Sequence, residues 1–138
     1  MSTFLGRKPL ELGFNEIKLS TLEEKQQFIG GQLGCIRFPM EIDLWINDEY
    51  LDIAENETHN LCILHANGET LHVYGNVFLA SFDRAGETVP LSKEQLEWVK
   101  EHSELYIGTS KIPTILFDLR ERAHKALNGG AQNDLLSM

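Results

Sequence analysis

The sequence predicts an α+β fold, in which a mainly antiparallel sheet of four to six strands carries two packed helices plus a C-terminal helix. Short runs of alternating apolar and polar residues indicate the strands. Gly-containing turns between the runs indicate hairpins, and two capping-box spacings indicate where helices begin. The 138 residues suit one domain. We expect it over residues 14–127, with residues 1–13 and 128–138 flexible.

The first two predicted elements are a strand and a short helix. FNEIKL, residues 14–19, alternates apolar and polar side chains, which is typical of a half-buried strand. Ser20 and Glu23 have the spacing of a capping box ahead of TLEEKQQFIGG. The Gly30–Gly31 pair predicts the end of this helix, because glycine readily adopts the left-handed conformation that closes helices.

A hairpin of two strands is predicted next. LGCIRF, residues 33–38, is followed by Pro39, and IDLWIN, residues 42–47, alternates with a period of two. The aliphatic side chains of the second run face one way and its polar side chains face the other, so we expect an acidic outer face. Residues 47–60 have no strand period and predict a long connection.

A second hairpin is predicted within LCILHANGETLHVYGNVFLASF. A strand over residues 61–65, an Asn67–Gly68 turn and a long strand over residues 72–82 follow one another. Both faces of the long strand are mostly apolar, which indicates a central strand covered on two sides. Gly75 in its middle allows a bulge or the close approach of a backbone or ligand. We expect a neighbouring loop to satisfy Asn76, with a ligand contact as the alternative.

The last predicted elements are a turn, a return strand and two helices. DRAGE, residues 83–87, suits a type I turn, and residues 88–91 suit a short strand. Ser92 and Gln95 repeat the capping-box spacing and start the helix KEQLEWVKEHSEL. KIPTILFDLRERAHKALNGG predicts the C-terminal helix, with Pro113 in its first turn and its closing NGG as the stop.

The negative charge is concentrated in one segment. Between Phe38 and Asp83 there are 9 acids and no Lys or Arg, whereas the rest of the chain carries 12 acids and 12 bases. Such a field repels phosphate, so we expect no direct binding of nucleic acid and a basic partner instead. The alternative is a solvated face that only aids solubility. The candidate partner-binding residues are Glu41, Asp43, Asp48, Glu49, Asp52, Glu55 and Glu57.

Four residues have a spacing that suggests zinc. His59, Cys62, His65 and His72 form an H-x2-C-x2-H-x6-H pattern, and such ligands suit a tetrahedral site. However, a strand over residues 61–65 would point Cys62 away from the flanking histidines. We therefore expect ordinary surface histidines, no metal and no cofactor. Cys35 and Cys62 are expected to be small buried side chains with free thiols.

No motif of a known enzyme class stands out in the chain. A Walker loop, G-x-S-x-G, H-E-x-x-H and a dinucleotide fingerprint are all missing, so we expect a protein that is not an enzyme. No run of about 18 apolar residues is present to span a membrane. The start, MSTFLGRKPLELG, has no apolar signal core, which predicts a cytoplasmic protein with no membrane partner.

Several short motifs occur in a characteristic order. A helix ending in Gly30–Gly31, the Asn47–Glu49 segment, and the strand motif Gly75–Phe78 are followed by an acidic-Gly-Glu turn and a helix start over Leu91–Gln95. Together with the later Asn60, this order resembles the uncharacterised family known as domain of unknown function 3846. The resemblance covers roughly residues 16–100, within STLEEKQQFIGGQLGCIRF, DLWINDEYL and VYGNVFLASFDRAGETVPLSKEQLEWV.

The resemblance implies a compact α+β domain from a phage, plasmid or bacterial genome, and it implies no catalytic residues. Residues 105–138 form a longer C-terminal extension than the family pattern has. We expect this extension, through its helix, to supply a homodimer or partner surface.

Two functions follow as expectations. The first is a non-enzymatic inhibitor of a phage or mobile element, a counter-defence protein that docks its acidic surface onto a basic host protein or nucleoprotein complex in the host cytoplasm. The alternative is a small-molecule binder that sequesters a nucleotide signal. The ligand-binding residues of that alternative are His72, Tyr74, Gly75, Asn76 and Arg84.

Overall fold

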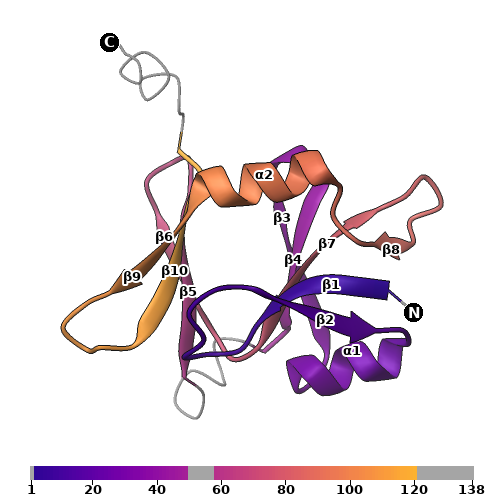
Figure 1. Cartoon of the computed structure of the whole chain (residues 1–138), viewed down its shortest axis with the longest axis horizontal. Helices are drawn as coiled ribbons and strands as arrows, with labels where there is room; N and C mark the ends of the chain where they lie inside the picture. Colours follow the sequence, from indigo (N-terminus) through magenta and orange to yellow (C-terminus); the bar gives the residue numbers. More distant parts are fainter. Residues whose placement is uncertain (1, 50–57, 121–138) are drawn as a thin grey trace, which may run out of the picture.

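The computed structural model describes residues 2–49 and 58–120, and it shows an α+β fold of mostly antiparallel strands with two helices (Figure 1). The strands form two sheets, where the sequence predicted one. Sheet A contains six strands in the order β2-β1-β7-β4-β3, with β8 also paired to β7. Its strands are β1 (Ser2–Arg7), β2 (Asn15–Leu19), β3 (Leu33–Phe38), β4 (Ile42–Asn47), β7 (Val77–Phe82) and β8 (Thr88–Val89).

Sheet B contains four strands in the order β6-β5-β10-β9. They are β5 (His59–Leu64), β6 (Thr70–Tyr74), β9 (Ser103–Ile107) and β10 (Pro113–Asp118). The β5–β10 pair is parallel, and the other two pairs are antiparallel.

Both predicted hairpins are present. The β3–β4 hairpin turns through the short 3-10 segment η1 (Pro39–Glu41). The β5–β6 hairpin turns at Asn67–Gly68, where the Gly68 N–H donates to the carbonyl of His65 at 2.9 Å.

The main core lies between the two sheets. Aliphatic side chains of β4 and β7 pack against those of β5 and β10, and Val99 of α2 (Lys93–His102) joins them, because α2 lies across one end of both sheets (Figure 1). The opposite face of sheet A packs on α1 (Leu22–Ile29). The central strands β4 and β7 of sheet A are therefore buried on both faces, while no described helix covers the outer face of sheet B (Figure 1).

Both helices begin with a capping box, as predicted, but the capping box of α1 lies one residue later than expected. In α1 the N-cap is Thr21, one residue beyond the predicted Ser20, and its hydroxyl accepts from the Glu24 N–H at 3.0 Å. Gly30, with φ of 93°, closes this helix as predicted. No helix of the described residues is long and apolar enough to cross a membrane.

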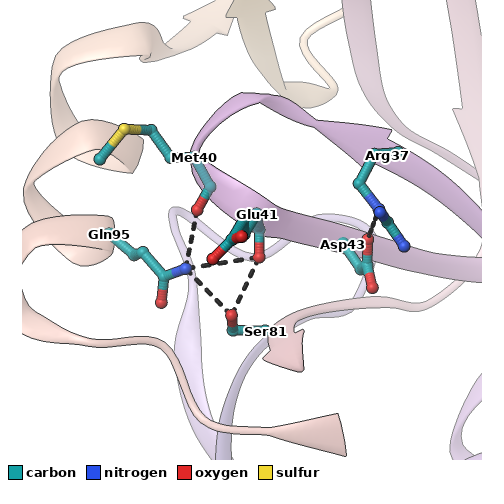
Figure 2. Close-up of polar contacts among 6 residues, drawn as sticks. All are labelled: Arg37, Met40, Glu41, Asp43, Ser81 and Gln95. Carbon is teal, nitrogen blue, oxygen red and sulfur yellow. Dashed lines mark hydrogen bonds and ion pairs between the residues drawn. The ribbon is translucent and has the colours of Figure 1, made fainter. Parts of the chain in front are cut away.

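In α2 the predicted pair forms the capping box, and Gln95 has a second role. Its Nε2 donates to the Met40 carbonyl at 2.8 Å and to the Ser81 hydroxyl at 3.0 Å (Figure 2). The carbonyl of Glu41 accepts from Ser81 Oγ at 2.9 Å. Met40 and Glu41 have φ of 67° and 59°, so these contacts hold a strained turn against the core.

The predicted flexible N-terminal segment is wrong over residues 2–7, which form a strand within sheet A. β1 lies between β2 and β7, and Phe4 is 2% exposed. The segment has no alternating pattern because both of its faces are covered. Phe4 packs toward α1, whereas Leu5 packs against the main core.

The predicted long strand over residues 72–82 is also wrong. The chain breaks at Gly75–Asn76, so β6 belongs to sheet B and β7 to sheet A. Gly75 is buried and has φ of 82°, which turns the chain from one sheet into the other. Asn76 Nδ2 donates to the Phe28 carbonyl at 2.8 Å, so the expected structural contact for its amide exists.

The predicted C-terminal helix does not begin at Pro113. Residues 113–118 form β10, and the remainder of the predicted helix, residues 121–127, lies outside the described residues, as do residues 128–138. PTILFD is strand because Ile115 and Phe117 alternate into the core beside β5.

Candidate functional site

The outer face of sheet B is hollowed into a cavity of about 450 Å³, which we call the sheet-B pocket. Side chains of all four strands and the loop between β9 and β10 line it. Among the described residues that line it, none is Lys, Arg, Asp or Glu, and its volume is within the range of small-molecule sites. The lining residues are His59, Cys62, His72, Tyr106, Gly108, Thr109, Ser110, Ile112, Thr114 and Leu116.

A β-bulge brings His59 and Cys62 to the same cavity. The pairing of β5 with β6 shifts register between His59 and Leu61, which makes Asn60 an extra residue. Strict alternation would place His59 and Cys62 on opposite faces. The sequence expectation that their side chains point apart is therefore wrong, because one extra residue reverses the alternation.

Two histidines are in direct contact at the pocket. His59 Nε2 lies 2.9 Å from His72 Nδ1, and His59 Nδ1 lies 3.1 Å from Thr114 Oγ1. The Tyr74 ring packs edge-on against His59, with centroids 5.2 Å apart. Burial lowers the pKa of His59, and the charges of His72 and Arg7 act in the same direction. All three effects favour the neutral form of the His59 imidazole.

The buried guanidinium of Arg7 donates hydrogen bonds to Asn60, the extra residue of the bulge. Arg7 is 0% exposed, and its Nη1 donates to the Asn60 carbonyl at 2.5 Å and to Asn60 Oδ1 at 2.6 Å. Its Nη2 donates to the carbonyls of Glu11 at 2.6 Å and Pro113 at 2.9 Å. Asn60 Nδ2 donates in return to the carbonyls of Arg7 and Gly75. We call these two side chains the Arg7–Asn60 cluster.

This cluster joins the two sheets at the bulge of β5. It connects β1 of sheet A to β5, to the start of β10 and to the crossover at Gly75. Burial lowers the pKa of Arg7, and the Glu11 carboxylate opposes this effect. Because arginine keeps its proton in proteins, the cluster carries a buried positive charge.

The zinc pattern of the sequence does not form a ligand set. His65 belongs to the β5–β6 turn and does not line the pocket that the other three residues share. Among the residues that the structure describes, no three His, Cys, Asp or Glu side chains are grouped closely enough to hold a metal ion.

The two thiols are protonated at neutral pH. The pKa of Cys35 is raised to about 11, first by partial burial of its thiol and then by the Asp43 carboxylate. Burial also raises the pKa of Cys62. Cys35 is exposed as a whole residue and Cys62 is half-buried, so the expectation of two buried cysteines is wrong. A thiol at either position is a poor nucleophile at pH 7.

Only one of the five predicted ligand residues, His72, lines the pocket. Tyr74 contacts His59 instead, and Gly75 and Asn76 form the crossover between sheets. Arg84 is exposed on the turn after β7, in a different sheet. The structure therefore does not bring these five residues together around the sheet-B pocket, because the chain changes sheet within the group.

The predicted acidic surface is divided by the fold. Asp43 is 4% exposed and pairs with Arg37 on sheet A, so its assignment to a docking surface is wrong (Figure 2). Every residue of β4 is buried or half-buried, which explains why the expected acidic outer face of this strand is absent. Glu41 is exposed before β4, and Asp48 and Glu49 are exposed after it. Asp52, Glu55 and Glu57 lie outside the described residues.

Helix α1, the loop that follows it and Glu49 after β4 line a second depression, of about 500 Å³. Two acids, Glu23 and Glu49, line it together with amide side chains and glycines. We call it the glutamine groove, after its lining residues Gln26, Gln27 and Gln32.

The sequence interpretation missed the side of the pocket formed by β9 and β10. Tyr106, Thr114 and the loop over residues 108–112 were assigned to a helix or left unassigned. The sequence does contain a pattern that predicts this hairpin. ELYI and PTILF are rich in residues with high strand propensity, and they lie on either side of a Gly-Thr-Ser turn sequence.

Comparison with known families gives one result. The sequence model described as Domain of unknown function (DUF3846) matches residues 6–104, which include Arg7, Asn60, His59 and His72. Neither a curated protein nor a solved structure matches the chain. Tyr106 and the β9–β10 loop lie beyond the matched residues.

Proposed function

Because the chain belongs to the family of the domain of unknown function 3846, whose description carries no activity, we propose from the site itself that it is a non-enzymatic protein that binds a small molecule in the sheet-B pocket. The observation that carries the proposal is the pocket with its paired histidines. The cavity is large enough for a ligand, and the His59–His72–Thr114 contacts hold polar atoms in fixed positions before any ligand arrives.

The lining supports binding better than catalysis. The Cys62 thiol of the lining is protonated at neutral pH, and none of the described lining residues has a carboxylate that could act as an acid or base beside the histidines. The remaining polar groups are hydroxyls and imidazoles, which orient a ligand by hydrogen bonds. The proposed ligand is a cellular metabolite that the protein sequesters.

A metabolite panel tested by thermal shift checks this proposal. A compound at 100 times its dissociation constant should stabilise the full chain by about 2.7 kcal/mol. Thr109→Trp, on the exposed loop, and Leu116→Trp, on the pocket floor, should each remove the shift by filling the cavity. His65→Gln, outside the pocket, is the matched control and should keep it. A shift that survives both filling substitutions would place the ligand elsewhere.

A second candidate function is the inhibitor of a basic host protein or nucleoprotein complex, encoded by a phage or mobile element. The glutamine groove favours it, because Glu23 and Glu49 flank amide side chains that suit a lysine or arginine from a partner. Asp48 is exposed next to this groove, and further acids follow in the sequence. Facing charges would speed association and make it sensitive to salt.

Charge reversal tests the inhibitor function. The double substitution Asp48→Lys and Glu49→Lys should weaken capture of a basic complex from host lysate and lower the salt concentration that releases it. We expect a loss of affinity of about 10-fold or more, because a like charge then faces the basic partner. Glu94→Lys and Glu97→Lys on the exposed face of α2 change the net charge equally. If this control pair weakens capture as much, net charge and not the groove is responsible.

A further inference from the structure

The protonation of the two pocket histidines follows from the hydrogen bonds around them. Thr114 Oγ1 donates to the Ile112 carbonyl at 3.3 Å, because a carbonyl oxygen can only accept. The lone pairs of Thr114 Oγ1 then accept the hydrogen bond from His59 Nδ1–H, 3.1 Å away. A neutral imidazole has one N–H, so His59 Nε2 is an acceptor. The proton between the two rings therefore belongs to His72 Nδ1, at 2.9 Å.

This order leaves one unprotonated nitrogen for a ligand. In its neutral form His72 uses its single N–H on His59, so its Nε2 carries a lone pair. The His72 side chain is exposed and lines the pocket. A ligand therefore meets a hydrogen-bond acceptor here, and a group that donates N–H or O–H fits it.

The floor and sides of the pocket also restrict the shape and the charge of a ligand. Cys62 and Leu116 are register partners on the two central strands, so the floor is weakly polar. His72 and Tyr106 lie on β6 and β9, the two edges of sheet B, and flank this floor with rings. None of the lining side chains that the structure describes carries a fixed charge, so an anionic group would find no direct ion-pair partner among them.

We infer that the ligand is an uncharged planar heterocycle, of the nucleobase or nucleoside class, which lies along the Cys62–Leu116 floor and donates a ring or amino N–H to His72 Nε2. This inference rests on the proposed binding function of the pocket and assigns its ligand class. It differs from the expected sequestration of a nucleotide, because a phosphate would meet no counter-charge among the lining residues that the structure describes.

The first test needs no ligand. Long-range ¹⁵N–¹H spectra of the labelled full chain at pH 8 report which imidazole nitrogen carries the proton. We expect Nδ1–H and a bare Nε2 for both His59 and His72, with each assigned by its Gln variant. An Nε2–H form of His72 would overturn the donor requirement, while leaving the proposed binding of some small molecule in the pocket intact.

The second test uses matched ligands. Titration calorimetry with adenosine, guanosine, cytidine and uridine, each against its own 5′-monophosphate, should show at least one nucleoside that binds 10-fold or more tightly than its nucleotide. His72→Phe, which keeps a ring but removes both nitrogens, should weaken that binding at least 10-fold, and His65→Phe should not change it.

The other outcomes separate the two proposals. Tighter binding of the nucleotide would overturn the requirement for an uncharged ligand. Binding of another metabolite from the panel, with no nucleoside bound, would overturn the ligand class but not the proposed function. No stabilising compound in any panel would count against both.

Discussion

Asn60→Leu should lower the free energy of unfolding by about 3–5 kcal/mol, the largest effect among the substitutions that we propose. The new side chain accepts no hydrogen bond, so the buried Arg7 guanidinium loses the Oδ1 acceptor that now lies 2.6 Å from Nη1. The carbonyls of Arg7 and Gly75 lose their donor at the same time. Urea unfolding followed by circular dichroism measures the loss.

A double-mutant cycle separates the charge from the packing. Arg7→Met removes the guanidinium, so Asn60→Leu added to it should cost clearly less than in the native background. Arg84→Met is the matched control, because Arg84 is exposed on a turn, and it should change stability by no more than about 0.5 kcal/mol. Strictly additive effects of the Arg7 and Asn60 substitutions would contradict the claim that these two side chains stabilise the fold through their mutual hydrogen bonds.

The Arg7–Asn60 cluster also shows what sequence patterns cannot predict. Arg7 lies in a segment with no periodicity, 53 residues away from Asn60 in the chain. Local patterns predicted the hairpins and helix caps, because those depend on neighbours such as Asn67 and Gly68 or Ser92 and Gln95. A buried cation held by distant carbonyls depends on how the sheets meet, which no local pattern records.

The same reasoning explains the error at the C-terminal end of the described chain. In PTILFDL, residues 113–119, Ile115, Leu116 and Leu119 fit a helical stripe as well as a buried strand, because short apolar runs do not distinguish the two. The strand forms because β10 pairs in parallel with β5, about 50 residues earlier. Tertiary pairing therefore makes this segment a strand, and this strand forms one side of the pocket.

The candidate site could be predicted only in its residue types. The histidine and cysteine spacing was visible in the sequence, but the bulge at Asn60 reverses the side on which His59 lies. A bulge leaves little trace in a single sequence. The ligand residues chosen around Gly75 failed for a related reason, because a positive φ at one glycine sends the chain to another sheet.

Gly75→Val should lower the free energy of unfolding by about 1–3 kcal/mol, because a β-branched residue strongly disfavours the φ of 82° that Gly75 adopts. The glycine cannot relax easily, since its N–H donates to the Thr58 carbonyl at 3.0 Å and its own carbonyl accepts from Asn60 at 2.7 Å. Thermal and urea unfolding measure the change.

Two other glycines calibrate the effect at Gly75. Gly68→Val places the same residue at φ of 91° in an exposed turn where an added Cβ meets nothing within 4 Å, so it reports backbone strain alone. Gly13→Ala meets nothing within 4 Å either and has no positive φ, so it should be nearly neutral. We expect Gly75→Val to cost more than Gly68→Val, because the buried crossover adds its hydrogen bonds to the strain. Equal costs at the two positions would mean that Gly75 is only a turn glycine, and that the crossover between the sheets does not depend on the contacts with Thr58 and Asn60.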